Sequence, residues 1–181
     1  MKNTMRKLIM SAAAAAFLTS PAMAELPTGA KAPGFSTQAA LAGKGFGFNL
    51  RAALSKGPVV LYFYPKAFTK GCTLEANAFA EAMPEFRKAG ATVIGMSNDD
   101  IDTLKRFSRE ECRDAFAVGV ASRKVIEAYD VALVHDGKDT GVTSRTSYVI
   151  APNGKIAMVH SDMDYRHHVE KTLAAVKALA D

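Results

Sequence analysis

The chain has 181 residues, of which 49% are hydrophobic and 23% charged, and its formal net charge is +5. This length suits one domain with a full hydrophobic core. Three of the positive charges lie at Lys2, Arg6 and Lys7, which leaves about +2 for the rest of the chain. Such a weak balance argues against a nucleic-acid-binding surface, so nucleic acid is excluded as an expected partner.

Residues 1–24 have the pattern of a secretory signal peptide. A basic head is followed by an apolar stretch from Leu8 to about Leu18 and an A-x-A sequence that ends at Ala24. A transmembrane anchor is the alternative, but the stretch is shorter than the ~20 residues that a span needs. We expect cleavage after Ala24, export, most simply to the periplasm, and a mature domain over residues 25–181 that no longer contacts the membrane.

The first half of this domain alternates between apolar runs and helical spacing. Residues 35–50 predict two short strands that turn at Gly43-Lys44. The continuous β-rich run at 58–64 is typical of a strand buried on both faces. Residues 72–89 have helical spacing that Gly90 ends, and 91–97 is a second buried strand.

The second half predicts a helix from Asp99 to about Arg109, a strand at 116–120 and a short helix at 122–129. A hairpin follows, in which 146–151 pairs with 155–161 around the turn Pro152-Asn153-Gly154. The final helix has one apolar face, made of Val169, Thr172, Leu173, Val176 and Leu179. This order predicts an α/β fold in which helices flank a central mixed β-sheet, with a β-hairpin at the N-terminal end.

The chain has two cysteines, Cys72 and Cys112, so the one possible intramolecular bridge joins them. Export would make such a disulfide permissible. Two cysteines do not make a zinc site without histidines at ligand spacing. His167 and His168 are adjacent, so on a helix their rings point about 100° apart, and we expect surface residues and no metal.

Cys72 lies where a buried strand connects to an amphipathic helix. A free cysteine is often only a small buried hydrophobic residue. At this position, however, the unpaired N–H groups of the helix start favour a thiolate, which is the nucleophilic form of the side chain. The following residues are Thr73-Leu74-Glu75, so the second sulfur of a CxxC exchange motif is missing.

The segment from Pro65 to Cys72, P-K-A-F-T-K-G-C, matches the P-x-x-x-T-x-x-C active-site motif of the peroxiredoxins. The longer stretch YFYPKAFTKGCTLEA resembles their bacterioferritin-comigratory, or peroxiredoxin Q, branch. The stretch SRTSYVI at 144–150 is similar to the strand start that supplies the active-site arginine of the family, here Arg145. The resemblance extends from about Ala30 to Ala180 and implies a thioredoxin-like fold.

The resemblance also implies a chemistry that needs no metal or organic cofactor. Cys72 would attack a peroxide and become a sulfenic acid, while Arg145 would hold both the thiolate and the peroxide. Thr69 would orient the peroxide through its hydroxyl, Pro65 would shape and screen the pocket, and Glu75 would orient Arg145. The implied partners are a hydroperoxide and a thiol reductant, either a thioredoxin-like protein or a small thiol, and the implied state is a monomer or weak dimer.

Two departures from the branch limit the comparison. Lys70 stands where a proline is common, and Asn77 stands where many members place a second, resolving cysteine. Cys112 is then the candidate resolving thiol. Alternatives are a one-cysteine mechanism with an outside thiol and a static Cys72–Cys112 disulfide, whose loop of about 40 residues would stabilise the fold by roughly 4 kcal/mol.

Two other functions stay open at this point. A thiol–disulfide exchange protein on the same fold would depend little on Arg145. A non-catalytic domain with a permanent Cys72–Cys112 bridge would consume no peroxide. Chemistry of the glutathione-peroxidase type is disfavoured, because that family uses a tryptophan and this sequence has none.

Overall fold

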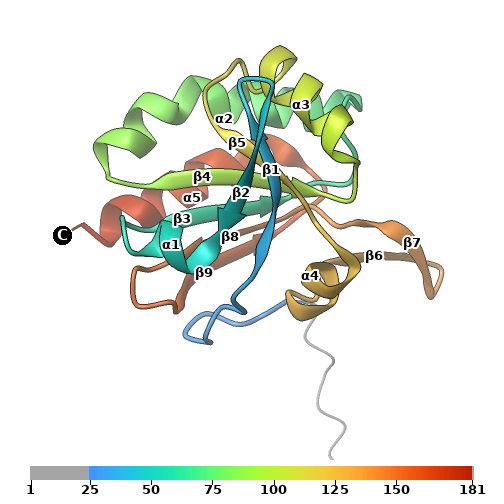
Figure 1. The fold of residues 1–181 in the computed structure, drawn as a ribbon. Helices are drawn as coiled ribbons and strands as arrows, with labels where there is room; N and C mark the ends of the chain where they lie inside the picture. The colour runs from blue at the N-terminus through green and yellow to red at the C-terminus, as the bar shows by residue number, and fades with distance from the viewer. Residues whose placement is uncertain (1–24, 181) are drawn as a thin grey trace, which may run out of the picture.

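The computed structural model describes residues 25–180 and contains, within them, a seven-stranded mixed sheet and a separate two-stranded sheet (Figure 1). The predicted signal peptide falls on residues 1–24 and lies outside the described part. The large sheet has the strand order β2-β1-β5-β4-β3-β8-β9. The β3–β4 and β4–β5 pairs are parallel and the other pairs are antiparallel, which confirms the prediction of a mixed sheet.

The elements in chain order are β1 (Ser36–Leu41), β2 (Lys44–Asn49), α1 (Leu50–Leu54), β3 (Val59–Phe63), α2 (Lys70–Lys88), β4 (Thr92–Ser97), α3 (Ile101–Glu110), β5 (Ala117–Val120), α4 (Arg123–Ala128), β6 (Ala132–His135), β7 (Lys138–Thr143), β8 (Thr146–Ile150), β9 (Ile156–Ser161), the 3-10 helix η1 (Tyr165–His167) and α5 (His168–Ala178). The strands and helices predicted from apolar patterning are therefore present, with ends that differ by at most two residues.

Strand β3 lies inside the sheet, between β4 and β8, and is buried along its whole length. Val59, Leu61 and Phe63 belong to one apolar core, whereas Val60 and Tyr62 belong to the core on the opposite face. This alternation follows the two-residue period of a strand and confirms burial on both faces. Helices α2, α3 and α5 cover the face of Tyr62, and α1 and α4 cover the other (Figure 1).

Helix α2 begins two residues earlier than the spacing predicts, which puts Cys72 in its first turn. Its buried side chains recur every three or four residues, from Cys72 to Phe86, and face the sheet. The helix ends as predicted at Gly90, whose φ of 70° lies in the left-handed region. The N–H groups of Gly90 and Ala91 then donate to the carbonyls of Arg87 and Phe86, the pattern of a Schellman motif.

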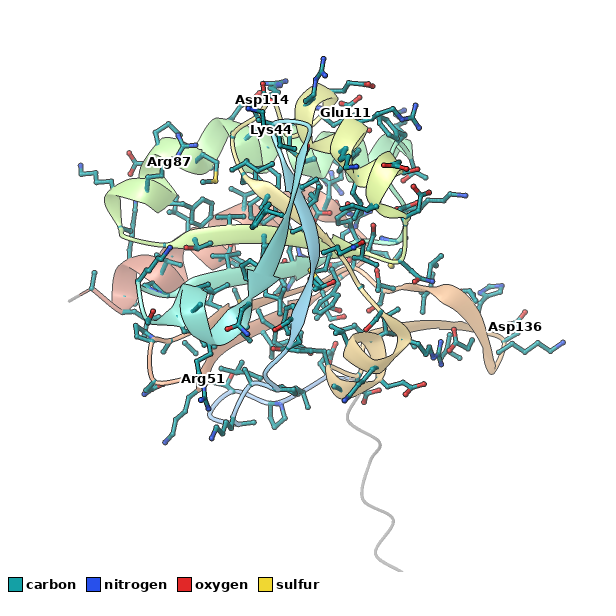
Figure 2. All side chains as sticks on the ribbon, in the orientation of Figure 1. Lys44, Arg51, Arg87, Glu111, Asp114 and Asp136 are labelled. Carbon is teal, nitrogen blue, oxygen red and sulfur yellow. The ribbon has the colours of Figure 1, made fainter. Side chains whose placement is uncertain are left out.

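Helix α1 and the β6–β7 hairpin are additions to the expected elements. The hairpin projects from the body of the molecule and carries Asp136 at its tip (Figure 2). Asp136 and Gly137 both have positive φ, as do Ala42 and Gly43, which form the β1–β2 turn one residue earlier than expected. No helix within residues 25–180 combines the length and apolar character that crossing a bilayer requires.

Candidate active site at the start of helix α2

The side chains of Cys72 and Arg145 meet at one end of the central strands. Strand β8 runs antiparallel to β3, and Phe63, the last residue of β3, pairs with Thr146, the first residue of β8. Because of this register, the residue before β8 lies beside the segment that follows β3 and leads into α2. Arg145 thereby reaches Cys72, and its Nη2 lies 3.4 Å from Sγ in a site where Cys72 is 2% exposed.

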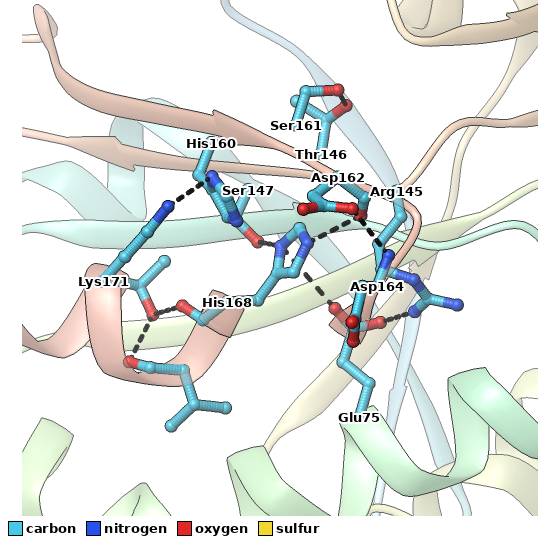
Figure 3. A network of polar contacts seen from close by, with 12 residues as sticks. Glu75, Arg145, Thr146, Ser147, His160, Ser161, Asp162, Asp164, His168 and Lys171 are labelled. Atoms are coloured by element: carbon cyan, nitrogen blue, oxygen red, sulfur yellow. Dashed lines mark hydrogen bonds and ion pairs between the residues drawn. The ribbon is translucent and has the colours of Figure 1, made fainter. Parts of the chain in front are cut away.

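Arg145 is buried and held on several sides. Its Nη1 donates to a carboxylate oxygen of Glu75, which lies one helical turn after Cys72 (Figure 3). Its Nε donates to the carbonyl of Met163 at 3.0 Å. A Cβ at Gly71 would lie 3.2 Å from Nη2, so the guanidinium lies directly against the backbone of the first turn of α2. These contacts direct one edge of the guanidinium at the sulfur.

Glu75 is fully buried and lies between Arg145 and the ring of His168. Burial raises the pKa of its carboxyl to about 8, although the charge and hydrogen bond of Arg145 oppose this rise. One carboxyl oxygen, Oε2, faces Arg145, and the other, Oε1, lies 3.8 Å from Nδ1 of His168. Among the described residues no group makes a hydrogen bond to Oε1.

The expectation that His167 and His168 both lie on the surface is wrong for His168. His167 is exposed, but His168 is fully buried, because the 100° between adjacent helical side chains turns one ring outward and the other into the core. His168 Nε2 lies 2.9 Å from the carbonyl oxygen of Asp162, and Nδ1 lies 2.8 Å from the hydroxyl of Ser147 (Figure 3). Burial lowers the pKa of His168 to about 4.

Within residues 25–180, no cluster of three His, Cys, Asp or Glu side chains is arranged to hold a metal ion.

Thr69 occupies the residue just before α2 and is exposed. Its backbone is extended, as is usual for a residue that starts a helix, but its hydroxyl makes no cap bond and donates instead to the carbonyl of Lys66 at 2.9 Å. Its own carbonyl accepts the N–H of Thr73. Thr69 is therefore fixed one turn before Cys72 with a hydroxyl that solvent can reach.

Pro65 is half-buried and lines a groove of about 650 Å³ together with Phe68, Asp99 and Val142. Asp99 holds the loop between Pro65 and Thr69 in place. Its Oδ2 accepts hydrogen bonds from the N–H of Ala67 and from the hydroxyl of Ser97, both at 2.8 Å. The segment before Cys72 thus has a defined shape.

Cys112 follows α3, and like Cys72 it is a free thiol. It is fully buried in the apolar core that also contains Cys72, on the same face of the sheet. Burial, with a smaller effect of the Glu111 carboxylate, raises the pKa of the Cys112 thiol. A 3.4 Å hydrogen bond from Asn77 to Glu111 connects α2 to the end of α3 next to Cys112.

Comparison with known proteins places this site in a family. The model of the AhpC/TSA family matches residues 28–159. Peroxiredoxin Bcp of Xanthomonas campestris pv. campestris is 32% identical over 124 residues, which are 67% of this chain and 78% of the relative.

Two solved structures are similar over most of the chain. Peroxidoxin BcpB from Mycobacterium tuberculosis is 32% identical, with a TM-score of 0.74 over 84% of this chain and 97% of that one. The bacterioferritin comigratory protein of Xanthomonas campestris, described for its alkyl peroxide reduction activity, is 31% identical, with a TM-score of 0.70 over 80% of this chain and 92% of that one. These findings confirm the thioredoxin-like fold, and the chain belongs to the AhpC/TSA family, on the branch of the Bcp and Q peroxiredoxins.

Proposed function

We propose that the protein is a thiol peroxidase that reduces hydrogen peroxide and organic hydroperoxides through Cys72. The observation that carries the proposal is the 3.4 Å contact between Arg145 Nη2 and Cys72 Sγ in the first turn of α2. The similarity to a protein described for alkyl peroxide reduction supports organic hydroperoxides as substrates.

In the first step, the thiolate of Cys72 attacks the terminal oxygen of the hydroperoxide. The S–O bond forms as the O–O bond breaks, so the sulfur is oxidised by two electrons to a sulfenic acid and the leaving oxygen departs as hydroxide or alkoxide, which takes up a proton. Negative charge moves from sulfur to the leaving oxygen. Arg145 faces the sulfur with a fixed guanidinium edge and stabilises this charge, since its donors are in place before the reaction.

Thr69 and Pro65 complete the proposed peroxide site. The solvent-accessible hydroxyl of Thr69, one turn before Cys72, is suited to bind the peroxide, and in doing so it would exchange its bond to Lys66 for one to substrate. Pro65 has no N–H to offer to water, and its apolar ring, seven residues before Cys72, would limit the access of water to the sulfenic acid.

In the second step, the Cys112 sulfur attacks the sulfenic sulfur of Cys72 and expels hydroxide, which leaves as water after protonation. The location of both sulfurs in one core supports this step. Two thiol groups of an outside reductant, a thioredoxin-like protein or a small thiol, then reduce the disulfide. The raised pKa of Cys112 means that this thiol is mostly protonated while buried, so resolution should be slower than the first step.

A thiol–disulfide exchange protein or a non-catalytic domain with a permanent bridge fits less well. An exchange protein has no need of a guanidinium buried against the sulfur, and a permanent bridge would silence that sulfur. The relatives are peroxiredoxins by name, which favours the peroxidase over both.

The test is the mass of the reduced protein after one equivalent of hydrogen peroxide, with dimedone as a trap, in the wild type and in Cys112→Ser. We expect rapid loss of two hydrogens in the wild type and a dimedone adduct on Cys72 in the variant. An adduct that forms and persists equally in both would show that Cys112 does not resolve Cys72. Absence of any reaction at Cys72 within minutes would refute the peroxidase.

We also propose that the protein is exported to the periplasm and acts there as a monomer or weak dimer. The basic head, short apolar stretch and A-x-A sequence of residues 1–24 support export. The N-terminal sequence of the protein recovered from the periplasmic fraction should begin at Glu25. Recovery of the uncut chain from the cytoplasm would contradict this proposal, and sedimentation of the mature chain measures its oligomeric state.

A further inference from the structure

The second oxygen of the Glu75 carboxyl group is a buried polar atom without a hydrogen bond in the described part of the chain. Such atoms are rare in folded proteins, because an unpaired buried polar group costs free energy. The group that faces Oε1 is the His168 ring, with Nδ1 at 3.8 Å. The mechanism proposed above has no role for this ring.

The hydrogen bonds of His168 determine what Nδ1 can offer. A carbonyl only accepts, so Nε2 carries a hydrogen and donates to Asp162. In the neutral ring Nδ1 then has one lone pair, which can accept either the hydroxyl of Ser147 or a proton carried by Glu75, whereas a protonated Nδ1 can donate to the oxygen of either residue. An ionised Glu75 would face this lone pair with one of its own. A single proton on either atom makes the contact attractive.

We propose that Glu75 and His168 share one proton, and that His168 is thereby a positioning residue for the reaction of Cys72. The inference rests on the proposed peroxidase function. His168 secures one oxygen of the carboxyl group, so that the other is held against Arg145 and the guanidinium edge stays directed at the sulfur. The same proton reduces the charge of Glu75 and leaves more of the positive charge of Arg145 to act on the thiolate.

The charged and titratable groups around Glu75 and His168 are consistent with one proton held between these two side chains. Arg145 and the Tyr62 hydroxyl on β3 face Glu75, and His160 on β9, with ring centroids 4.6 Å apart, faces His168 beside Asp162. Burial raises the pKa of Glu75 to about 8 and lowers that of His168 to about 4. The pair therefore holds one proton across the pH range between these values.

Two substitutions of His168 test the contributions of its two ring nitrogens separately. The amide of His168→Gln reaches the place of Nε2 and can keep the bond to Asp162, whereas that of His168→Asn reaches the place of Nδ1 near Glu75. His167→Gln is the matched control, since this neighbour is exposed. The measurements are the rate constant for oxidation of Cys72 by hydrogen peroxide and the pH dependence of Cys72 alkylation by iodoacetamide.

We expect His168→Gln to lower the rate constant by roughly tenfold or more, because the guanidinium loses its fixed direction. It should also move the midpoint of alkylation to higher pH. His168→Asn should keep more of the rate, and His167→Gln should match the wild type. A wild-type rate and pH profile in His168→Gln would overturn the proposal. So would a larger loss in His168→Asn than in His168→Gln, which would indicate that the ring only supports the turn at Asp162.

A second measurement needs no variant. The carboxyl ¹³C shift of Glu75 and the ring ¹⁵N shifts of His168 in the wild type report directly on the proton between pH 4 and 9. One bound proton at pH 6 supports the proposal, and an ionised Glu75 beside a neutral His168 at that pH refutes it. A wild type that consumes no peroxide would refute the proposed function instead, while these shifts would still decide the state of the pair.

Discussion

At the scale of single residues, the site depends on the direction of one guanidinium group. Arg145 is held by Glu75 and by the carbonyl of Met163, and its remaining edge faces Cys72. A lysine in its place would keep the charge but would lose the planar fork that binds several acceptors at once.

We therefore predict that Arg145→Lys lowers the rate constant for hydrogen peroxide by about a hundredfold, as expected for the loss of a preorganised donor. Stopped-flow measurement of peroxide consumption tests this, with Arg123→Lys as a control at an exposed ion pair. A rate within a factor of about two of the wild type would show that only the charge at Arg145 matters, against the geometric role given to its fork.

Gly71 is the second residue at which a substitution should have a clear effect on the reaction rate. An added Cβ would lie 3.2 Å from Arg145 Nη2, and the anchored guanidinium has little freedom to withdraw. Gly71→Ala should therefore lower the rate constant several-fold while the chain still folds, because the helix itself accepts alanine. Gly34→Ala is the control, since its Cβ would meet nothing within 4 Å. An unchanged rate in Gly71→Ala would mean that the guanidinium can move without loss.

The motif around Cys72 could be identified in the sequence, but the burial of His168 beside Glu75 could not. The adjacent pair His167-His168 has no spacing typical of a site, and its burial depends on which face α5 turns to β8 and β9. Adjacent side chains on a helix point in different directions, so the sequence indicates only that one of the two rings can lie in the core while the other is exposed.

At the scale of secondary-structure elements, α2 carries both the thiol and the carboxyl group that orients its partner. Cys72 and Glu75 are three residues apart and so share one face of the helix. Helix α5 brings His168 to the same carboxyl group. The packing of α2 against α5 therefore determines the electrostatics behind Arg145.

This arrangement predicts a pH dependence of stability. Glu75 has a folded pKa raised from 4.5 to about 8, so its contribution is fully present below 4.5 and is lost as the pH rises to 8. His168 has a folded pKa lowered from 6.5 to about 4, so its contribution is present above 6.5 and is lost as the pH falls to 4. The two slopes cancel between about 4.5 and 6.5, and above 6.5 only that of Glu75 remains.

The free energy of unfolding from these two groups should be level from about pH 4.5 to 6.5 and should fall by about 2 kcal/mol from pH 6.5 to 8. Urea unfolding of the reduced protein at several pH values measures it. Glu75→Gln should remove the fall above pH 6.5, because an amide does not ionise. Persistence of the same fall in this variant would assign it to another group.

The secondary-structure elements also differ in how well sequence patterns alone predict them. A run buried on both faces, such as β3, has a strong apolar signal, and Gly90 marks the end of α2 through a backbone conformation that glycine adopts easily. The β6–β7 hairpin lacks such a run, since most of its residues are exposed. Its one local signal is the Asp136-Gly137 turn.

At the scale of the whole molecule, both sulfurs lie beneath the surface of one core, with Cys72 2% and Cys112 0% exposed. An outside thiol cannot reach a disulfide buried in this way. The proposed cycle therefore needs a rearrangement of the start of α2 or the end of α3 after oxidation.

We predict faster backbone hydrogen exchange in the oxidised protein than in the reduced one, confined to the first turn of α2, the residues around Cys112, or both segments. Exchange followed by mass spectrometry on both forms tests this, and Cys112→Ser treated with peroxide is the control because it cannot form the bridge. Equal protection of these segments in both forms would exclude the rearrangement.

The sequence by itself determined those features that depend on neighbouring residues: the buried strands, the helix that begins near Cys72, the P-x-x-x-T-x-x-C motif and, through resemblance, the family. Only the tertiary structure decided which distant residues meet. Arg145 reaches Cys72 because β3 and β8 pair in one register, and His168 reaches Glu75 because α5 packs on α2. These contacts depend on how the chain returns on itself, and local periodicity carries no information about that.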